Sequence, residues 1–226
     1  MQSFETLGLS GEIVDAVRKL GFETPTPVQS KAIPVLLQGQ QDVVALAQTG
    51  TGKTAAFGLP LIQLMDENDN TTRALVLAPT PELAAQNGDS FRVYGKFLGL
   101  STAVVFGGAS MHKQKQAMFR GVDVLVATPG RLLDHVSQRS IRLDKVEILV
   151  LDEADHMLDM GFIHDLRRIA TILPRARQTL FFSATMPPQI ATLSRELLRK
   201  PATINIERKS APATGITQAL YPVPQT

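Results

Sequence analysis

The sequence of 226 residues contains no cysteine and no tryptophan, and only 5% of its residues are aromatic. Without cysteine, no disulfide and no cysteine-ligated metal site can form. No apolar run approaches the roughly 18 residues that a membrane-spanning helix needs, because stretches such as 75–78 and 148–151 have the length of strands. The first residues also lack the basic and apolar regions of a secretory signal peptide. We therefore expect a cytoplasmic protein without a membrane segment.

Charge is nearly balanced, with 23 Lys and Arg against 21 Asp and Glu and a net charge of +2. The chain therefore lacks the strong basic field of many duplex-binding modules, and any nucleic-acid site must be local. The four histidines are dispersed without metal-ligand spacing, so we expect surface or hydrogen-bonded roles for them. A hydrophobic content of 44% is that of an ordinary globular domain, and the length favours one domain.

Short β-branched runs alternate with amphipathic segments along most of the chain. The expected strands are 42–47, 73–78, 102–106, 123–127, 146–151, 179–183 and 203–206, and the helices that follow include 53–65, 82–97, 111–120, 131–138, 163–173 and 188–198. Further helices are expected near 9–20 and 28–37. This alternation predicts an α/β fold whose central, mostly parallel sheet has helices on both faces. Residues 1–40 should join the core at 41–207, with 208–226 as a linker and a further strand near 218–223.

The strongest chemical signal follows the first expected strand and opens a helix. It comprises Ala47, Gln48, Thr49, Gly50, Thr51, Gly52, Lys53 and Thr54. The two glycines permit a tight loop whose N–H groups surround phosphate, while the lysine reaches the β and γ phosphates and Thr54 faces Mg²⁺. Ala47 stands where the general pattern has glycine. A glycine-rich turn with an incidental lysine is the alternative, but the position between strand and helix favours a phosphate-binding loop.

Two carboxylates, Asp152 and Glu153, follow the hydrophobic strand that ends at residue 151. By themselves they would more often be a helix cap with an acidic first turn. Beside a phosphate-binding loop, Asp152 is the expected metal ligand, directly or through water, and Glu153 is placed to orient an attacking water. With Lys53, they are the candidate catalytic residues.

The tetrapeptide that continues from these carboxylates is Asp152-Glu153-Ala154-Asp155, and the chain resembles the first RecA-like lobe of a DEAD-box RNA helicase, especially the bacterial RhlE group. The resemblance covers essentially the whole chain. It implies ATP and Mg²⁺ as cofactors. It also implies an adenine-reading segment at 21–29, in which Phe22, Thr26 and Gln29 contact the nucleotide together with the upstream Phe4.

The resemblance further implies contacts with the backbone of single-stranded RNA or a short duplex. The residues concerned are Pro79, Thr80, Gly107, Gly108, Thr128, Pro129, Gly130 and Arg131. Ser183 and Thr185 resemble the motif that couples ATP and RNA binding through Asp155. Such turns gather at one edge of a parallel sheet, where small residues and helix N-termini suit phosphate contacts.

The sequence departs from the family pattern at Pro81, where the family has arginine, so this position has no side-chain donor for the polar contact expected of that motif. The second RecA-like lobe, which in relatives supplies arginines to the transferring phosphoryl group, is also missing. We therefore expect that the chain binds nucleotide and does not unwind RNA alone. We also expect it to be a monomer. Two alternatives are another P-loop enzyme and a non-catalytic RNA-binding or scaffold module. Against the first alternative, the chain contains neither an Asn-Lys-x-Asp nor a Leu-Ser-Gly-Gly-Gln motif. Against the second, Lys53, Asp152 and Glu153 are all intact.

Overall fold

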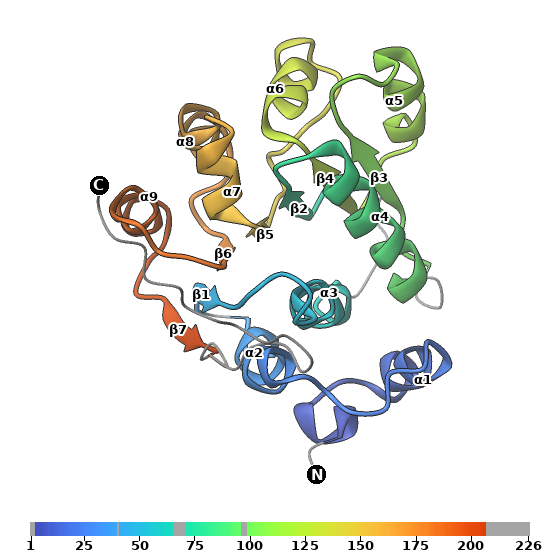
Figure 1. The fold of residues 1–226 in the computed structure, drawn as a ribbon. Helices are drawn as coiled ribbons and strands as arrows, with labels where there is room; N and C mark the ends of the chain where they lie inside the picture. The colour runs from blue at the N-terminus through green and yellow to red at the C-terminus, as the bar shows by residue number, and fades with distance from the viewer. Residues whose placement is uncertain (1–2, 40, 66–70, 96–98, 207–226) are drawn as a thin grey trace, which may run out of the picture.

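A computed structural model of the chain describes residues 3–39, 41–65, 71–95 and 99–206. Its centre is one seven-stranded sheet with the order β3-β4-β2-β5-β6-β1-β7, and all neighbouring strands in it pair in parallel (Figure 1). The strands are β1 (Val43–Leu46), β2 (Ala74–Leu77), β3 (Thr102–Val105), β4 (Val124–Ala127), β5 (Ile148–Leu151), β6 (Gln178–Ser183) and β7 (Ala202–Asn205). The predicted fold class is confirmed, and the sheet is wholly parallel in the described residues.

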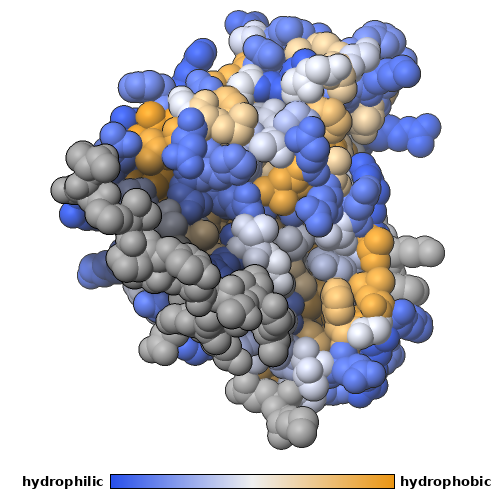
Figure 2. Space-filling model, in the orientation of Figure 1, coloured by the Kyte–Doolittle hydropathy of each residue, from blue (hydrophilic) through white to orange (hydrophobic). Residues whose placement is uncertain are grey.

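The helices divide into two groups that cover opposite faces of the sheet. One face carries η1 (Phe4–Leu7), α1 (Gly11–Lys19), α2 (Pro27–Leu37), α3 (Lys53–Gln63) and α4 (Pro81–Gly95). The other carries α5 (Met111–Met118), α6 (Pro129–Ser137), α7 (Ala154–Asp159), α8 (Ile163–Ile172) and α9 (Pro188–Leu197). Figure 2 shows a largely hydrophilic surface on which hydrophobic side chains gather over α1 and α4. Within the described ranges, no helix is long and apolar enough to cross a membrane.

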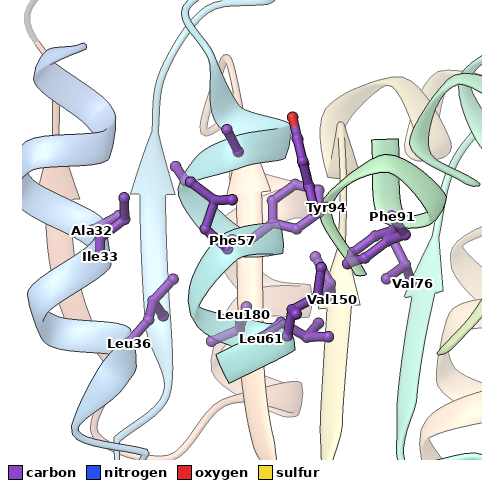
Figure 3. Packing of buried hydrophobic residues seen from close by; sticks show 14 of the residues in the cluster. Ala32, Ile33, Leu36, Phe57, Leu61, Val76, Phe91, Tyr94, Val150 and Leu180 are labelled. Carbon is purple, nitrogen blue, oxygen red and sulfur yellow. The ribbon is translucent and has the colours of Figure 1, made fainter. Parts of the chain in front are cut away.

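The core consists of two hydrophobic clusters, one on each face of the sheet. Successive strand residues point to opposite faces, so Val76 joins the cluster of α2, α3 and α4, and Leu77 joins the other. Helix α3 lies between α2 and α4, and its Phe57 ring lies near Phe91 of α4 (Figure 3), with 6.2 Å between the ring centroids. The centroid of the Phe182 ring on β6 is 5.1 Å from that of Phe57. This packing fixes the helix whose first residue is Lys53.

Three helices begin at a Thr-Pro pair: α2 after Thr26, α4 after Thr80 and α6 after Thr128. Proline suits the first helical position because its fixed φ is already helical and its missing N–H would have no partner there. The Thr26 and Thr80 hydroxyls accept hydrogen bonds from the N–H groups of Gln29 and Leu83, at 3.5 and 3.2 Å. The α4 and α6 starts follow β2 and β4, so they bring helix N-termini to the carboxyl edge of the sheet.

The boundaries of the expected strands and helices agree with the structure to within two residues. The expectations omitted η1 and α7, whose four and six residues are too short to show a clear helical period. The linker at 208–226 and the strand near 218–223 lie outside the described residues.

Candidate functional site

The predicted phosphate-binding loop connects the carboxyl end of β1 to the first residue of α3. Gly50 and Gly52 have φ values of 81° and 90°, in the left-handed region that favours glycine. A Cβ atom on Gly52 would also lie 2.5 Å from Nε2 of Gln29. The backbone angle of Gly52 and the close approach of the Gln29 side chain therefore both favour glycine at this position.

Gln29 joins the loop to the start of α2. It is 5% exposed, its Nε2 donates to the Gly52 carbonyl at 3.1 Å, and its Oε1 accepts from the Thr26 N–H at 3.0 Å. The predicted adenine-reading segment and the phosphate-binding loop thus meet in space, although 23 residues separate Gln29 from Gly52. Reading of adenine by Gln29 stays a prediction.

The two aromatic residues expected near the base lie in different environments. Phe4 is 3% exposed and belongs to the hydrophobic core. Phe22 is 39% exposed and lines a shallow groove of about 560 Å³ with Leu20, Glu82 and Val93, over the α1 and α4 surface visible in Figure 2. Of the two rings, Phe22 is the one with a face open to a ligand, and the loop at 47–54 does not line its groove.

Lys53 and Asp152 form the electrostatic centre of the site. They are 6% and 2% exposed, and Nζ of the lysine and Oδ1 of the aspartate have no hydrogen-bond partner among the described residues. Burial raises the pKa of Asp152, although a hydrogen bond from Asn87 and the charge of Lys53 oppose the shift. Because buried unpaired polar groups are costly, these two atoms suit a ligand: phosphate oxygens for the lysine and a hard cation for the carboxylate.

Asn87, which the sequence analysis did not select, bridges the loop and the carboxylate. Its side chain on α4 is 0% exposed, its Oδ1 accepts from the Thr54 hydroxyl at 3.3 Å, and its Nδ2 donates to Asp152 Oδ2 at 3.0 Å. It lies on the buried face of α4 between Ala84 and Phe91. An amide at a core position of an amphipathic helix was the available signal.

Glu153 has a strained backbone, with φ 54° and ψ 54° in the left-handed region. Its Oε1 accepts a hydrogen bond from the Thr49 hydroxyl at 2.8 Å, and its Oε2 lies 3.5 Å from Nδ1 of His156. Non-glycine residues hold this conformation only where the surroundings enforce it, and such strain concentrates at functional sites. The arrangement brings the predicted catalytic carboxylate against the phosphate-binding loop.

The predicted coupling residues form a closed hydrogen-bond network between α7 and the end of β6. Asp155 Oδ2 accepts from the N–H and hydroxyl of Thr185 at 2.9 and 2.8 Å, and the Asp155 N–H donates to the Ser183 hydroxyl at 3.2 Å. Burial acts to raise the pKa of Asp155, but the hydrogen bonds with Thr185 and Ser183 hold it below its usual value. The structure thus brings these three residues together.

The residues expected to contact RNA follow β2, β3 and β4 at the carboxyl edge. Gly107 and Gly108 are exposed, with open space where each Cβ would stand, and Gly108 has a φ of 82°. Pro79, Thr128 and Pro129 are buried, while Thr80 and Gly130 are partly exposed. The two glycines are therefore the most accessible members of the set.

Arg131 is turned largely into the protein, with its side chain only 14% exposed. Its Nη1 donates to the Ala109 carbonyl at 2.9 Å and to Gln114 Oε1 at 3.2 Å. The same Gln114 oxygen lies 3.0 Å from Nε2 of His135, whose pKa is lowered by burial and then by the Arg131 charge. Arg131 thus supports the loop that contains Gly107 and Gly108. Gln114 and His135, whose roles were not predicted from the sequence, extend this hydrogen-bonded support.

Comparison with known proteins agrees with this site. The DEAD/DEAH box helicase family matches residues 26–193. Relatives named DEAD-box ATP-dependent RNA helicase CshA in Bacillus cereus and ATP-dependent RNA helicase CshA in Listeria monocytogenes are 43% and 44% identical over 218 residues, which cover 96% of this chain and 41% and 42% of theirs. The chain therefore spans less than half the length of these curated relatives.

Solved structures give the same result. A DEAD box protein from the hyperthermophile Methanococcus jannaschii matches with a TM-score of 0.88 and 39% identity, covering 92% of this chain and 56% of that one. A hypothetical ATP-dependent RNA helicase from Sulfolobus tokodaii matches with 0.81 and 39%, covering 88% and 57%. The RhlE subgroup stays a prediction, because the relatives above carry the name CshA. With most of the chain inside the family's match and its motifs assembled at one edge of the sheet, the chain belongs to the DEAD/DEAH box helicase family.

Proposed function

We propose that the chain is the ATP-binding lobe of an ATP-dependent RNA helicase. The observation that carries the proposal is the pair of buried, unpartnered atoms, Lys53 Nζ and Asp152 Oδ1, at the loop between β1 and α3. Relatives named as ATP-dependent RNA helicases support the same activity. The protein is further proposed to act as a cytoplasmic monomer.

In this proposal, Lys53 and the loop N–H groups bind the ATP phosphates, and Gln29 and Phe22 contact adenine. Thr54 and Asp152 hold Mg²⁺, with Asp152 acting directly or through water. When bound, magnesium neutralises charge on the phosphate oxygens. Glu153, held by Thr49, orients the attacking water. A scaffold without catalysis would not need the strained backbone of Glu153 beside the loop.

RNA would bind at the same edge of the sheet, through Thr80, Gly107, Gly108 and Gly130, with Arg131 positioning the glycine loop. The network of Asp155, Ser183 and Thr185 would link that surface to the nucleotide, since Asp155 follows Glu153 by two residues. Backbone contacts of this kind carry little sequence specificity.

Calorimetric titration with Mg-ATP and Mg-GTP tests nucleotide binding. We expect ATP to bind more tightly than GTP, because an amide that pairs with the exocyclic amine of adenine meets the wrong pattern in guanine. Lys53→Ala should abolish measurable binding, whereas Lys113→Ala, an exposed lysine on α5, should not change it. Equal affinity for ATP and GTP, or unchanged binding in Lys53→Ala, would overturn the proposal.

Turnover tests the need for the second lobe. The chain alone should hydrolyse ATP slowly, since arginines supplied from a partner are worth on the order of 10³ to 10⁵ in rate. Joined to a second RecA-like lobe, it should show RNA-stimulated turnover that Glu153→Gln abolishes. Rapid RNA-dependent hydrolysis by the 226 residues alone would contradict the assigned division of roles.

A further inference from the structure

Phe119, the residue that follows α5, is 89% exposed. The next most exposed large hydrophobic side chain in the described ranges is Met160, at 46%. The neighbours of Phe119 in the chain, Met118 and Val122, are 7% and 4% exposed and belong to the core. The core is thus filled without Phe119, and its ring contributes little to folding where it stands.

Phe119 borders a hollow of about 470 Å³, here called the Phe119 cavity. Two segments form most of its wall, 118–122 at the end of α5 and 139–145 between α6 and β5. Both lead into amino ends of strands, so the cavity lies on the edge of the sheet opposite the phosphate-binding loop. Met118, Val122 and Ile141 supply apolar lining, and the volume is within the range of small-molecule sites.

The wall of the cavity is strongly basic for a chain whose net charge is only +2. It carries Arg120, Arg139, Arg142 and Lys145 against one carboxylate, Asp144. Arg142 is held by that carboxylate in a paired contact at 3.1 and 2.9 Å. Within the described ranges the side chains of Arg120, Arg139 and Lys145 make no ion pair within 4.0 Å, although the charge of Lys145 helps to lower the pKa of Asp144. These cations therefore lie beside an exposed ring without a bonded carboxylate.

We propose that the Phe119 cavity binds single-stranded RNA, with one base stacked on Phe119 and neighbouring phosphates on Arg120, Arg139 and Lys145. An aromatic platform beside cations is how proteins hold single strands without reading sequence. A duplex fits this site less well because its bases are stacked and cannot pack on Phe119. An acidic peptide also fits less well because it does not alternate planar rings with anions. The proposal rests on the proposed function, because it assumes that this chain handles RNA.

The site would be separate from the RNA surface at the carboxyl edge. A strand of four residues spans about 13 Å, so one RNA segment must pass along the side of the sheet to reach both edges. The cavity would therefore hold the flanking part of a long strand, and a short oligonucleotide would reach one surface only.

The absence of tryptophan allows a direct test. Phe119→Trp creates a single reporter, and Val93→Trp on α4, where the native side chain is 42% exposed, is the matched control. A 20-nucleotide oligouridylate should quench the fluorescence at position 119 in a saturable manner and leave position 93 unchanged. A blunt RNA duplex and polyglutamate should quench neither. Absent quenching, or equal quenching by polyglutamate, would overturn the proposal, the latter in favour of an acidic protein partner.

Affinity measurements complete the test. Phe119→Ala should weaken binding of the 20-mer by about 5- to 150-fold, the value expected for one base–aromatic stack, while Met160→Ala should leave it unchanged. Arg139→Gln and Lys145→Gln should each lower the slope of log affinity against log salt by about 0.7. The affinity for ATP should stay as in the unmodified chain.

The outcomes separate this proposal from the proposed function. If Phe119→Ala binds the 20-mer as tightly as the unmodified chain, while ATP and RNA binding persist, the cavity proposal is wrong and the proposed function stands. If the unmodified chain binds ATP but no single-stranded RNA under low salt, both the cavity and the RNA surface at the carboxyl edge are wrong.

Discussion

Two buried aspartates show how differently the two edges of the sheet are built. Asp42 precedes β1 at the amino edge, and its oxygens accept the backbone N–H groups of Thr179 and Arg199, both at 2.6 Å. Asp152 follows β5 at the carboxyl edge, where one oxygen accepts from Asn87 and the other has no partner among the described residues. Both side chains are almost inaccessible, at 6% and 2% exposure.

The difference separates a structural carboxylate from a functional one. A buried acid whose oxygens are bonded to backbone fixes the ends of strands, and nothing is left for a ligand. A buried acid with one unpaired oxygen lowers the stability of the fold until a bound ligand supplies a partner for that oxygen. Burial by itself therefore identifies neither role, whereas the count of hydrogen-bond partners distinguishes them.

Matched substitutions provide the largest test of this comparison. Asp42→Asn should lower the free energy of unfolding by about 2 to 4 kcal/mol, because its amide group cannot accept from both backbone N–H groups. Asp152→Asn should change it by less than about 1 kcal/mol, or raise it, because a poorly paired buried charge disappears. Urea unfolding of both variants measures this, and equal losses would remove the distinction between the edges.

A second test concerns the backbone of the carboxyl edge. Gly52→Ala should cost about 2 to 3 kcal/mol, since it combines a φ of 90° with a Cβ placed 2.5 Å from Gln29. Gly50→Ala is the control, because its φ of 81° carries backbone strain in open space, worth about 1 kcal/mol. Denaturant melts compare them, and a Gly52 variant no less stable than the Gly50 variant would show that Gln29 moves aside freely.

The pH dependence of stability distinguishes two carboxylates within the site, Asp152 and Asp155. The raised pKa of Asp152 means that the folded state holds its proton more tightly than the unfolded state. Its contribution to stability therefore decreases as the pH rises from the ordinary aspartate pKa through the raised value. The lowered pKa of Asp155 acts oppositely, adding stability above the ordinary value that is lost as the pH falls through the folded pKa.

Thermal melts across acidic and neutral pH measure both effects. Relative to the unmodified chain, Asp152→Asn should gain stability as the pH rises, and Asp155→Asn should lose it. A common direction for the two variants would contradict the assigned shifts.

The smallest expected effect on stability is that of Pro81→Arg. Pro81 begins α4, and the Thr80 hydroxyl caps the Leu83 N–H, so arginine should fit this partly exposed turn within about 0.5 kcal/mol. In a two-lobed protein, RNA binding should tighten by about 1 to 3 kcal/mol if the guanidinium meets a phosphate, with a salt slope steeper by about 0.7. Fluorescence titration at several salt concentrations measures this, and unchanged affinity would assign the family's arginine an intramolecular role.

The sequence was sufficient for what local chemistry encodes. The alternation of elements predicted the parallel sheet, and the glycine spacing predicted the loop before Lys53, because strand burial and left-handed turns depend on nearby residues. It was not sufficient for Asn87, Gln114 and His135, whose roles depend on which distant segments meet. The burial of Phe4 and the inward turn of Arg131 were missed for the same reason, since packing decides where a long or aromatic side chain points.

The position of β1 between β6 and β7 also affects when the protein can fold during its synthesis on the ribosome. Thr179 meets Asp42 across 137 residues of chain, and β7 pairs with β1 still later. At about 5 to 20 residues per second, a ribosome needs roughly 7 to 30 s after making β1 before its first partner strand exists. During synthesis, β1 and the phosphate-binding loop that follows it therefore remain without a partner strand. The protein can bind ATP only when nearly the whole lobe has been made.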